Sequence, residues 1–113
     1  MSCNETSEKN FETIGRYTSP TLTIEVPLDL REANVYVTFK QNDVVVLEKT
    51  NDEITVDASR IIIPLSQEDT SHFSRGLLLF QVRYVFVDGT SDFSYPLATS
   101  VIDAYKEGVL EYV

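Results

Sequence analysis

The chain has 113 residues, enough for one domain with its own core, and a net charge of −9. Its single cysteine, Cys3, excludes an internal disulfide and a cysteine-rich zinc site. Its nine basic residues are scattered and outnumbered by 18 acidic ones, whereas phosphate backbones and anionic lipids are bound by clustered Lys and Arg. We therefore expect neither nucleic acid nor a membrane among the partners, and no apolar run approaches the roughly 18 residues of a membrane helix.

The two ends of the chain differ in character from its middle. Residues 1–15 are polar and without periodicity, which predicts a mobile N-terminal tail. They contain no apolar stretch of the signal-peptide kind, so we expect synthesis in the cytoplasm. Residues 16–106 are the expected folded domain, and residues 107–113 are interpreted as an edge strand or a docking segment. Four apolar residues of that segment lack an obvious place in the core: Val109, Leu110, Tyr112 and Val113.

The first expected strand is TLTIEVPL, residues 21–28. Its apolar residues alternate with the others and would share one face: Leu22, Ile24, Val26 and Leu28. A period of two is that of a half-buried strand. Pro27 cannot donate a hydrogen bond to a neighbouring strand, so the strand is expected to end there or to lie at an edge.

A hairpin is expected next. NVYVTFKQ, residues 34–41, alternates again, and VVVLEKT, residues 44–50, returns beside it. The inward face of the first of these strands should carry Val35, Val37 and Phe39. Between the strands lie Asn42 and Asp43, residue types that tolerate left-handed backbone angles and so favour a tight turn.

The longest expected strand lies in LLLFQVRYVFV, residues 77–87. It is apolar on most of both faces, which is typical of the middle of a sheet. One of its faces is wholly apolar: Leu78, Phe80, Val82, Tyr84 and Phe86. Before it, NDE marks a turn, and ITVDASRIIIPL predicts either one bulged strand or two short ones. After it, DGTSD turns the chain and FSYPLATSVIDA, residues 93–104, returns as its partner.

These patterns predict an all-β fold. About seven short strands with turns every 8–12 residues or so, and almost no helix, are typical of an antiparallel immunoglobulin-like β-sandwich. The cysteine pair and tryptophan of antibody domains are absent from the sequence.

The stretch PLSQEDTSHFSRG, Pro64–Gly76, most resembles a functional site, because it holds the only histidine, His72. Each of its residue types also has a structural role in one capped helical turn. Ser66 can cap the first turn, where negative charge is favoured, and Gly76 can end the helix. The remaining roles fall to Glu68 and Asp69 in the first turn, to Phe73 as an apolar anchor and to Arg75 near the far end. We therefore expect a helical turn that crosses from one sheet to the other.

We predict no catalytic, metal or cofactor site, and no enzymatic activity. His72 has no second histidine to share a metal with, and adjacent Ser71 does not face it on a helical turn. VDGTSD lacks the alternating acids of a calcium loop, and Asp88 with Gly89 is typical of a hairpin. Neither pair of neighbouring acids, Asp52–Glu53 or Glu68–Asp69, can face a partner across a cleft as glycosidase carboxylates do. With four glycines in the chain, no glycine-rich phosphate loop is present.

The linear order of four segments resembles a known family. They are GRYTSPTLTIEVPLDL, NVYVTFKQNDVVVLEKT, IIIPLSQEDTSHFSRGLLLFQVRYVFVDGT and ATSVIDAYKEGVL. Over about residues 16–110 the chain is similar to small proteins encoded in tail regions of phages and prophages of Gram-positive bacteria, which resemble the N-terminal immunoglobulin-like domain of baseplate upper proteins. The residues that carry the resemblance are Leu65 to Thr70, Gly76, Gln81, Val82, Arg83, Asp88 and Gly89. The resemblance implies a structural role without catalytic residues.

Three functional hypotheses remain open. The first is a structural or interaction module of phage tail or baseplate type, made in the host cytoplasm and then incorporated into a virion, with protein partners and possible homo-oligomers. The second is a carbohydrate- or ligand-binding sandwich, in which exposed aromatic rings stack on a sugar: Tyr36, Tyr84 or Tyr95. The third is a prophage accessory protein that binds a host factor.

Overall fold

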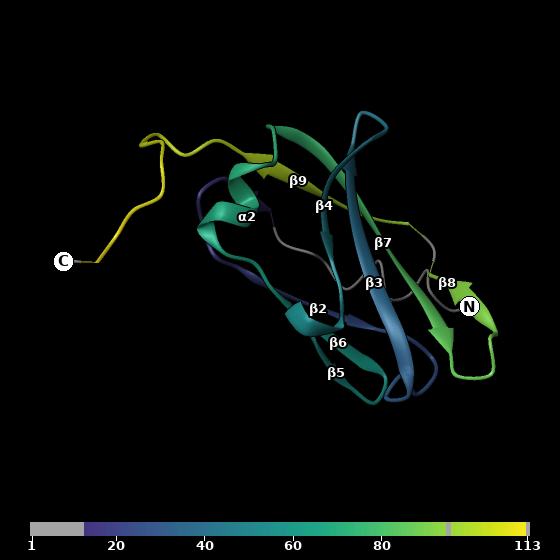
Figure 1. Ribbon diagram of the computed structural model, residues 1–113. Helices are drawn as coiled ribbons and strands as arrows, with labels where there is room; N and C mark the ends of the chain where they lie inside the picture. Colours follow the sequence, from purple (N-terminus) through teal and green to yellow (C-terminus); the bar gives the residue numbers. More distant parts are fainter. Residues whose placement is uncertain (1–12, 95, 113) are drawn as a thin grey trace.

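Two β-sheets face each other and enclose the core (Figure 1). The structure is a computed structural model and describes residues 13–94 and 96–112. The larger sheet has the strand order β1-β9-β7-β3-β4, with β8 paired to β7, and the smaller sheet has the order β2-β6-β5. The strands of the larger sheet are β1 (Ile14–Gly15), β3 (Ala33–Gln41), β4 (Val44–Lys49), β7 (Gly76–Phe86), β8 (Ser91–Phe93) and β9 (Leu97–Ile102). Those of the smaller sheet are β2 (Thr21–Glu25), β5 (Thr55–Asp57) and β6 (Arg60–Pro64).

The predicted hairpin of β3 and β4 is confirmed. Asn42 and Asp43 form its turn with φ angles of 53° and 64°, the left-handed angles that their residue types tolerate. The register shifts between Phe39 and Lys40, so β4 carries a bulge opposite that point. Bulges twist an edge strand, and β4 is an edge of the larger sheet.

β7 lies between β3 and β9, as predicted for the strand that is apolar on most of both faces. On its inner face Leu78 and Val82 are fully buried. Phe80 stacks on Phe39 of β3 with ring centroids 5.4 Å apart, and Phe73 packs on Phe39 at 5.7 Å. Burial of each such side chain stabilises the fold by roughly 1.5–3 kcal/mol, so this inner face is the centre of the core.

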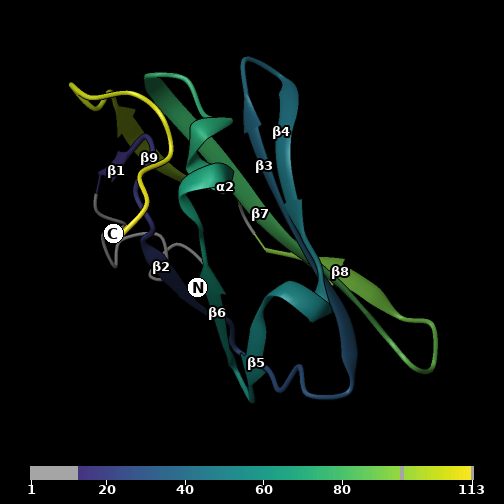
Figure 2. The ribbon, with the colours of Figure 1, turned by 60° about the vertical axis from the view of Figure 1, so that its left-hand side comes forward.

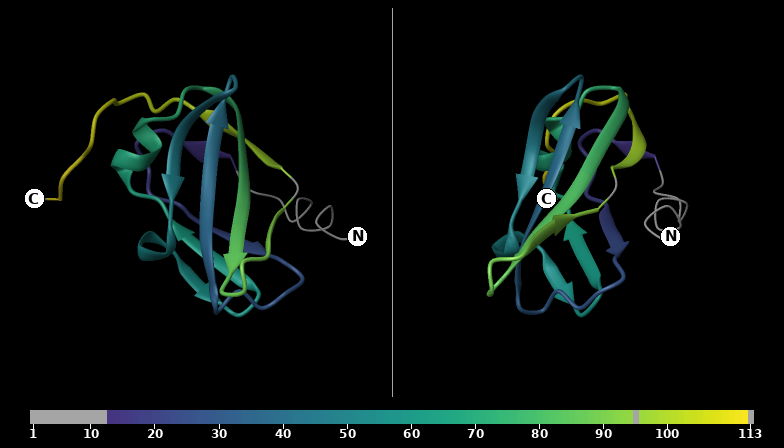
Figure 3. Two further views of the ribbon diagram at one scale, coloured as in Figure 1. Left: turned by 45° about the vertical axis from the view of Figure 1, so that its right-hand side comes forward. Right: turned by 90° about the vertical axis from the view of Figure 1, so that its right-hand side faces the viewer.

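The smaller sheet covers that core from the other side, and the two sheets appear as separate layers in Figure 3. Its inner residues are fully buried: Ile24, Ile61 and Ile63. β2 ends before Pro27 and lies at an edge, as its proline predicts. The segment around Ala58 makes two short strands, because a left-handed turn at Ala58 (φ 57°) separates β5 from β6.

The structure differs from the sequence prediction at the N-terminal boundary. Residues 13–15 were expected in the tail, but Ile14 and Gly15 form β1 and Ile14 is buried. β1 pairs in parallel with Val101 and Ile102 of β9, so the sandwich contains one parallel pair among antiparallel ones. The rest of the expected tail, residues 1–12, lies outside the described residues.

The expected partner of β7 is divided into two strands, which brings the described strands to nine. β8 and β9 both pair with β7, and Ser94 stands at the break between them. Ser94 remains bonded to β7, because its N–H donates to the Val82 carbonyl at 2.8 Å and its hydroxyl accepts from the Val82 N–H at 3.0 Å.

The prediction that Gly76 ends the helix is wrong. The helix α2 (Gln67–Ser71) ends at His72 in an ordinary right-handed conformation, and Arg75 lies beyond its last turn. Gly76 has a φ of 126° and opens β7 instead. Figure 2 shows α2 where the chain passes from β6 to β7, the crossing that was expected. Among the described residues, no helix is long and apolar enough to cross a membrane.

Val82→Asp is expected to prevent folding, because it places an unpaired charge where the side chain is fully buried. The loss should exceed about 4 kcal/mol, a large part of the stability of a small domain. Leu77→Asp on the same strand is the matched control: Leu77 is exposed, so its loss should stay within about 1 kcal/mol. Thermal melts followed by circular dichroism measure both, and a Val82→Asp melt like that of the wild type would contradict this account of the core.

Candidate functional site

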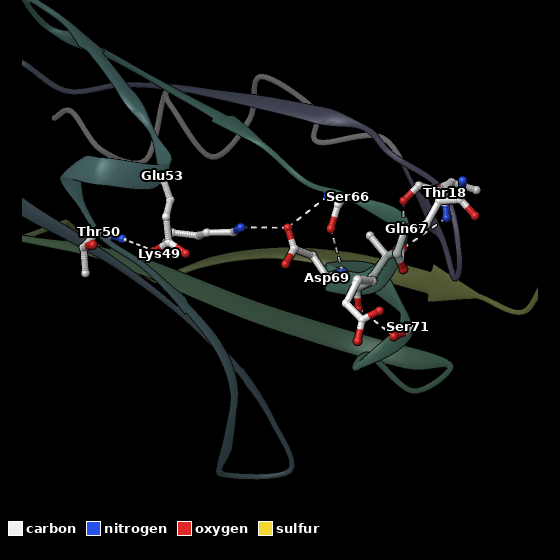
Figure 4. A network of polar contacts seen from close by, with 10 residues as sticks. Thr18, Lys49, Thr50, Glu53, Ser66, Gln67, Asp69 and Ser71 are labelled. Carbon is white, nitrogen blue, oxygen red and sulfur yellow. Dashed lines mark hydrogen bonds and ion pairs between the residues drawn. The ribbon is translucent and has the colours of Figure 1, made fainter. Parts of the chain in front are cut away.

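The stretch Pro64–Gly76 forms the predicted capped turn (Figure 4). The hydroxyl of Ser66 accepts a hydrogen bond from the Asp69 N–H at 3.0 Å, and the Asp69 carboxylate accepts one from the Ser66 N–H at 2.9 Å. This reciprocal pair satisfies backbone donors that the first turn of a helix leaves unpaired. The main role of Ser66 and Asp69 in this candidate site is therefore to cap α2.

Asp69 also binds a cation, Lys49 at the end of β4. Lys49 Nζ lies 2.7 Å from Asp69 Oδ2, and the two side chains are only 10% and 15% exposed. Burial alone would raise the pKa of Asp69, but the hydrogen bonds from Lys49 and Ser66 outweigh it and lower that pKa below its ordinary value. The ion pair thus joins the end of β4, in the larger sheet, to α2 (Figure 4).

Two further contacts hold this connector in place. The Thr70 hydroxyl donates to the Thr18 carbonyl at 2.8 Å and accepts from the Thr18 N–H at 3.0 Å. The amide of Gln41, at the end of β3, bonds both the N–H and the carbonyl of Ser74, at 2.8 and 2.7 Å. Polar groups of this stretch that could have served chemistry therefore serve the junction of the two sheets.

His72 is exposed at the end of α2, as expected of a residue on a connector. The neighbouring Ser71 hydroxyl donates to the Glu68 carbonyl at 2.6 Å, within the helical turn. The Ser71 hydroxyl is therefore engaged by the helical turn and not by His72, contrary to what a serine nucleophile would need.

The other acidic candidates also serve turns. Glu53 accepts from the Thr50 N–H at 3.0 Å and caps the short 3-10 helix η1 (Asn51–Glu53). Asp88 accepts from the N–H and the hydroxyl of Thr90, which lower the pKa of its carboxyl and close the hairpin. Across residues 13–94 and 96–112, no group of three His, Cys, Asp or Glu side chains is placed to hold a metal ion. Cys3 lies outside the described residues.

A shallow groove of about 520 Å³ crosses the outer face of the larger sheet. Its lining comes from four strands: Tyr36, Thr38, Glu48, Arg83, Tyr84, Val85 and Ser91. Tyr36 and Arg83 are register partners on β3 and β7, and the Thr38 hydroxyl donates to Glu48 at 3.0 Å. The groove thus combines an aromatic ring with a cation and an anion. We call it the sheet-face groove.

The structure separates the three tyrosines considered for ring stacking. Both Tyr36 and Tyr84 belong to the lining of the sheet-face groove, but Tyr36 is 38% exposed whereas Tyr84 is 6% exposed and part of the core. Tyr84 is therefore not available for stacking, because its ring packs edge-on against Phe86 at 5.8 Å. Tyr95 lies outside the described residues.

The outer face of the larger sheet also exposes large apolar side chains. Leu77 and Leu79 project from β7 on the face opposite the core, and Leu79 is the register partner of Lys40 and Ala98. Val45 on β4 lies across from Lys40, so the row continues to the sheet edge. The sequence placed Leu77 and Leu79 on this face, but which strands flank them follows only from the register.

The comparisons with known proteins find a likeness of fold but none of sequence. No protein-family model matches the chain, and no curated protein matches it. Among solved structures, CopC from Methylosinus trichosporium OB3b is similar with a TM-score of 0.51 and 9% identity, over 87% of this chain and 91% of CopC. Extracellular domains 3–5 of Drosophila OTK give a TM-score of 0.40 and 12% identity, over 84% of this chain and 33% of that one. The chain is an immunoglobulin-like β-sandwich, as predicted, and at these identities the likeness concerns the fold alone.

Asp69→Asn is expected to remove part of the acid sensitivity of the fold. Because the pKa of Asp69 is lowered on folding, its stabilising contribution is full above about pH 4, the ordinary Asp range, and is lost as the pH falls through the folded-state pKa. The variant should also lose about 3 kcal/mol near neutral pH, because Lys49 is left nearly buried without its partner.

Urea unfolding at several pH values between neutral and acid measures both effects. His72→Ala is the control on the same connector and should stay within about 0.5 kcal/mol of the wild type. A steep acid loss that survives in Asp69→Asn would show that another carboxylate is responsible.

Proposed function

We propose that the chain is a non-enzymatic interaction module of phage tail or baseplate type. What supports the proposal is the resemblance over about residues 16–110 together with the surface of the sandwich. Polar residues of the best candidate site cap α2 and join the sheets, whereas large apolar side chains are exposed on the outer face and after β9. Exposed apolar groups of this kind favour contact with another protein.

The test is whether the chain travels with phage particles. Particles from a strain that carries the gene are purified on a density gradient, and an antibody against this chain is used to follow it. We expect the chain in the particle fractions, bound to a tail or baseplate protein. Recovery outside the particles with a host protein as its sole partner would favour the accessory-protein hypothesis instead.

A second candidate function, saccharide binding, is favoured by the sheet-face groove. The exposed ring of Tyr36 can stack on the apolar face of a sugar. Beside it, Arg83 can donate hydrogen bonds to hydroxyl groups and Glu48 can accept them. A neutral saccharide fits this mixture best, because the net charge of −9 repels anionic ligands.

A glycan array followed by calorimetry tests this candidate. We expect Tyr36→Ala to abolish saccharide binding, because it removes the stacking ring of the groove. Tyr105→Ala is the matched control, since Tyr105 is exposed but lies outside the groove. An array without a single bound glycan removes the candidate, and equal binding by both variants would place the sugar elsewhere.

A further inference from the structure

The segment after β9, residues 104–112, leaves the sandwich as an arm. Figure 1 shows it pass α2 and end clear of both sheets. Tyr105 and Tyr112 are fully exposed, and Val109 and Leu110 are each more than half exposed. Over its described residues the arm forms no strand, and its large side chains are not buried in the core. Of the two expected interpretations of this segment, the edge strand is therefore ruled out and the docking segment remains.

Among the described residues, the Gln67 side chain bonds the arm itself, and Arg16 pairs with Asp103 at its base at 3.1 Å. The Gln67 amide nitrogen donates to the Leu110 carbonyl at 3.0 Å, and the Leu110 N–H donates to the Gln67 amide oxygen at 2.7 Å. Within the described part of the chain, these are the hydrogen bonds that join residues 104–112 to α2. The amide of Gln67 therefore occupies the place of a neighbouring strand residue, with one donor and one acceptor.

This pairing leaves the other edge of the arm open. In an extended strand the N–H and carbonyl of one residue point to the same side, and successive residues alternate. Gln67 engages both backbone groups of Leu110, whereas among the described residues no hydrogen bond joins the backbone of Val109 or Glu111 to the sandwich. The arm thus offers backbone groups to a further strand, flanked by apolar side chains.

β4 is the edge that best matches the arm. It is six residues long, whereas β1 has two and β5 has three. It pairs with β3 alone, and its Val44 and Val45 are 60% and 55% exposed. Two edges remain: β8 has only three residues, and β2 exposes Thr21, Thr23 and Glu25, which are polar. Length and apolar surface therefore both favour β4.

We propose that the arm of one copy, through Val109–Tyr112, adds as a further strand to the β4 edge of a second copy. Backbone hydrogen bonds supply the pairing, and Val44 and Val45 cover the apolar side chains of the arm. Because each copy carries both an arm and a β4 edge, reciprocal exchange closes the assembly as a dimer. The interface is independent of the proposed tail function, since it needs only copies of this chain.

The assembly should also depend on salt in a characteristic direction. Each copy carries a net charge of −9, so the copies repel each other, while the proposed contact is apolar and made by the backbone. Salt screens the repulsion and should strengthen the association. A contact held together by ion pairs would respond in the opposite way.

Sedimentation of the full chain and three variants, at rising concentration, tests the proposal. One variant ends at Lys106 and lacks the arm, and Val45→Lys places a charge at the β4 edge. Val87→Lys is the matched control, because Val87 is exposed in the turn after β7, outside both elements. We expect the full chain and Val87→Lys to associate, and the other two to stay monomeric with unchanged melting curves.

A mixing experiment makes the test sharper. The truncated chain still offers β4 and the Val45→Lys chain still offers its arm, so an equimolar mixture of the two is expected to associate although neither does alone. Association by the truncated chain would overturn the proposal. Association by Val45→Lys alone, as strong as that of the wild type, would also overturn it and would favour pairing between the arms of two copies. A full chain that stays monomeric at the highest concentration reached would overturn it as well. That result would leave the proposed tail function unaffected, because the particle experiment tests that function separately.

Discussion

The carboxylate of Asp69 makes the contact on which the arrangement of the two sheets depends. It caps α2 through Ser66 and pairs with Lys49 of the larger sheet, while the chain just after α2 brings Phe73 against Phe39 in the core. A helix of five residues is not stable alone, so α2 keeps its position only through such contacts. These contacts hold α2 against the larger sheet and keep the ring of Phe73 in the core.

Much of the fold could be predicted from the sequence because the residues that specify a strand or a tight turn lie next to each other in the chain. Alternation marks β2, β3 and β7, and two residues that tolerate left-handed angles mark the β3–β4 turn. β1 could not be found this way, because it is two residues long and pairs in parallel with β9 across the whole domain. Nothing near Ile14 in the sequence specifies a partner so distant.

The candidate sites show the same division between local and distant information. The cap formed by Ser66 and Asp69 lies within four residues and could be predicted, whereas the Lys49 partner comes from another strand. Tyr36 could be named from the sequence as a candidate stacking residue, but the sheet-face groove around it could not be predicted, since its residues come from four strands and meet only through the register. His72 stood out in the sequence because it is the single histidine of the chain, but this count does not indicate which side chains lie near it.

In three places among the described residues, an amide side chain bonds both an N–H and a carbonyl of the backbone. Gln41 bonds both backbone groups of Ser74, and Asn51 bonds the Val35 N–H and the Ala33 carbonyl beside η1. In both places a side chain stands where a strand residue is missing, and the segment so held is anchored by buried neighbours such as Phe73 and Val35. Gln67 likewise bonds both backbone groups of Leu110, but none of the large apolar side chains of the arm is buried. A segment that exposes apolar side chains in this way gains stability when a second surface covers them, and this is the physical reason to look for its partner on an apolar strand edge.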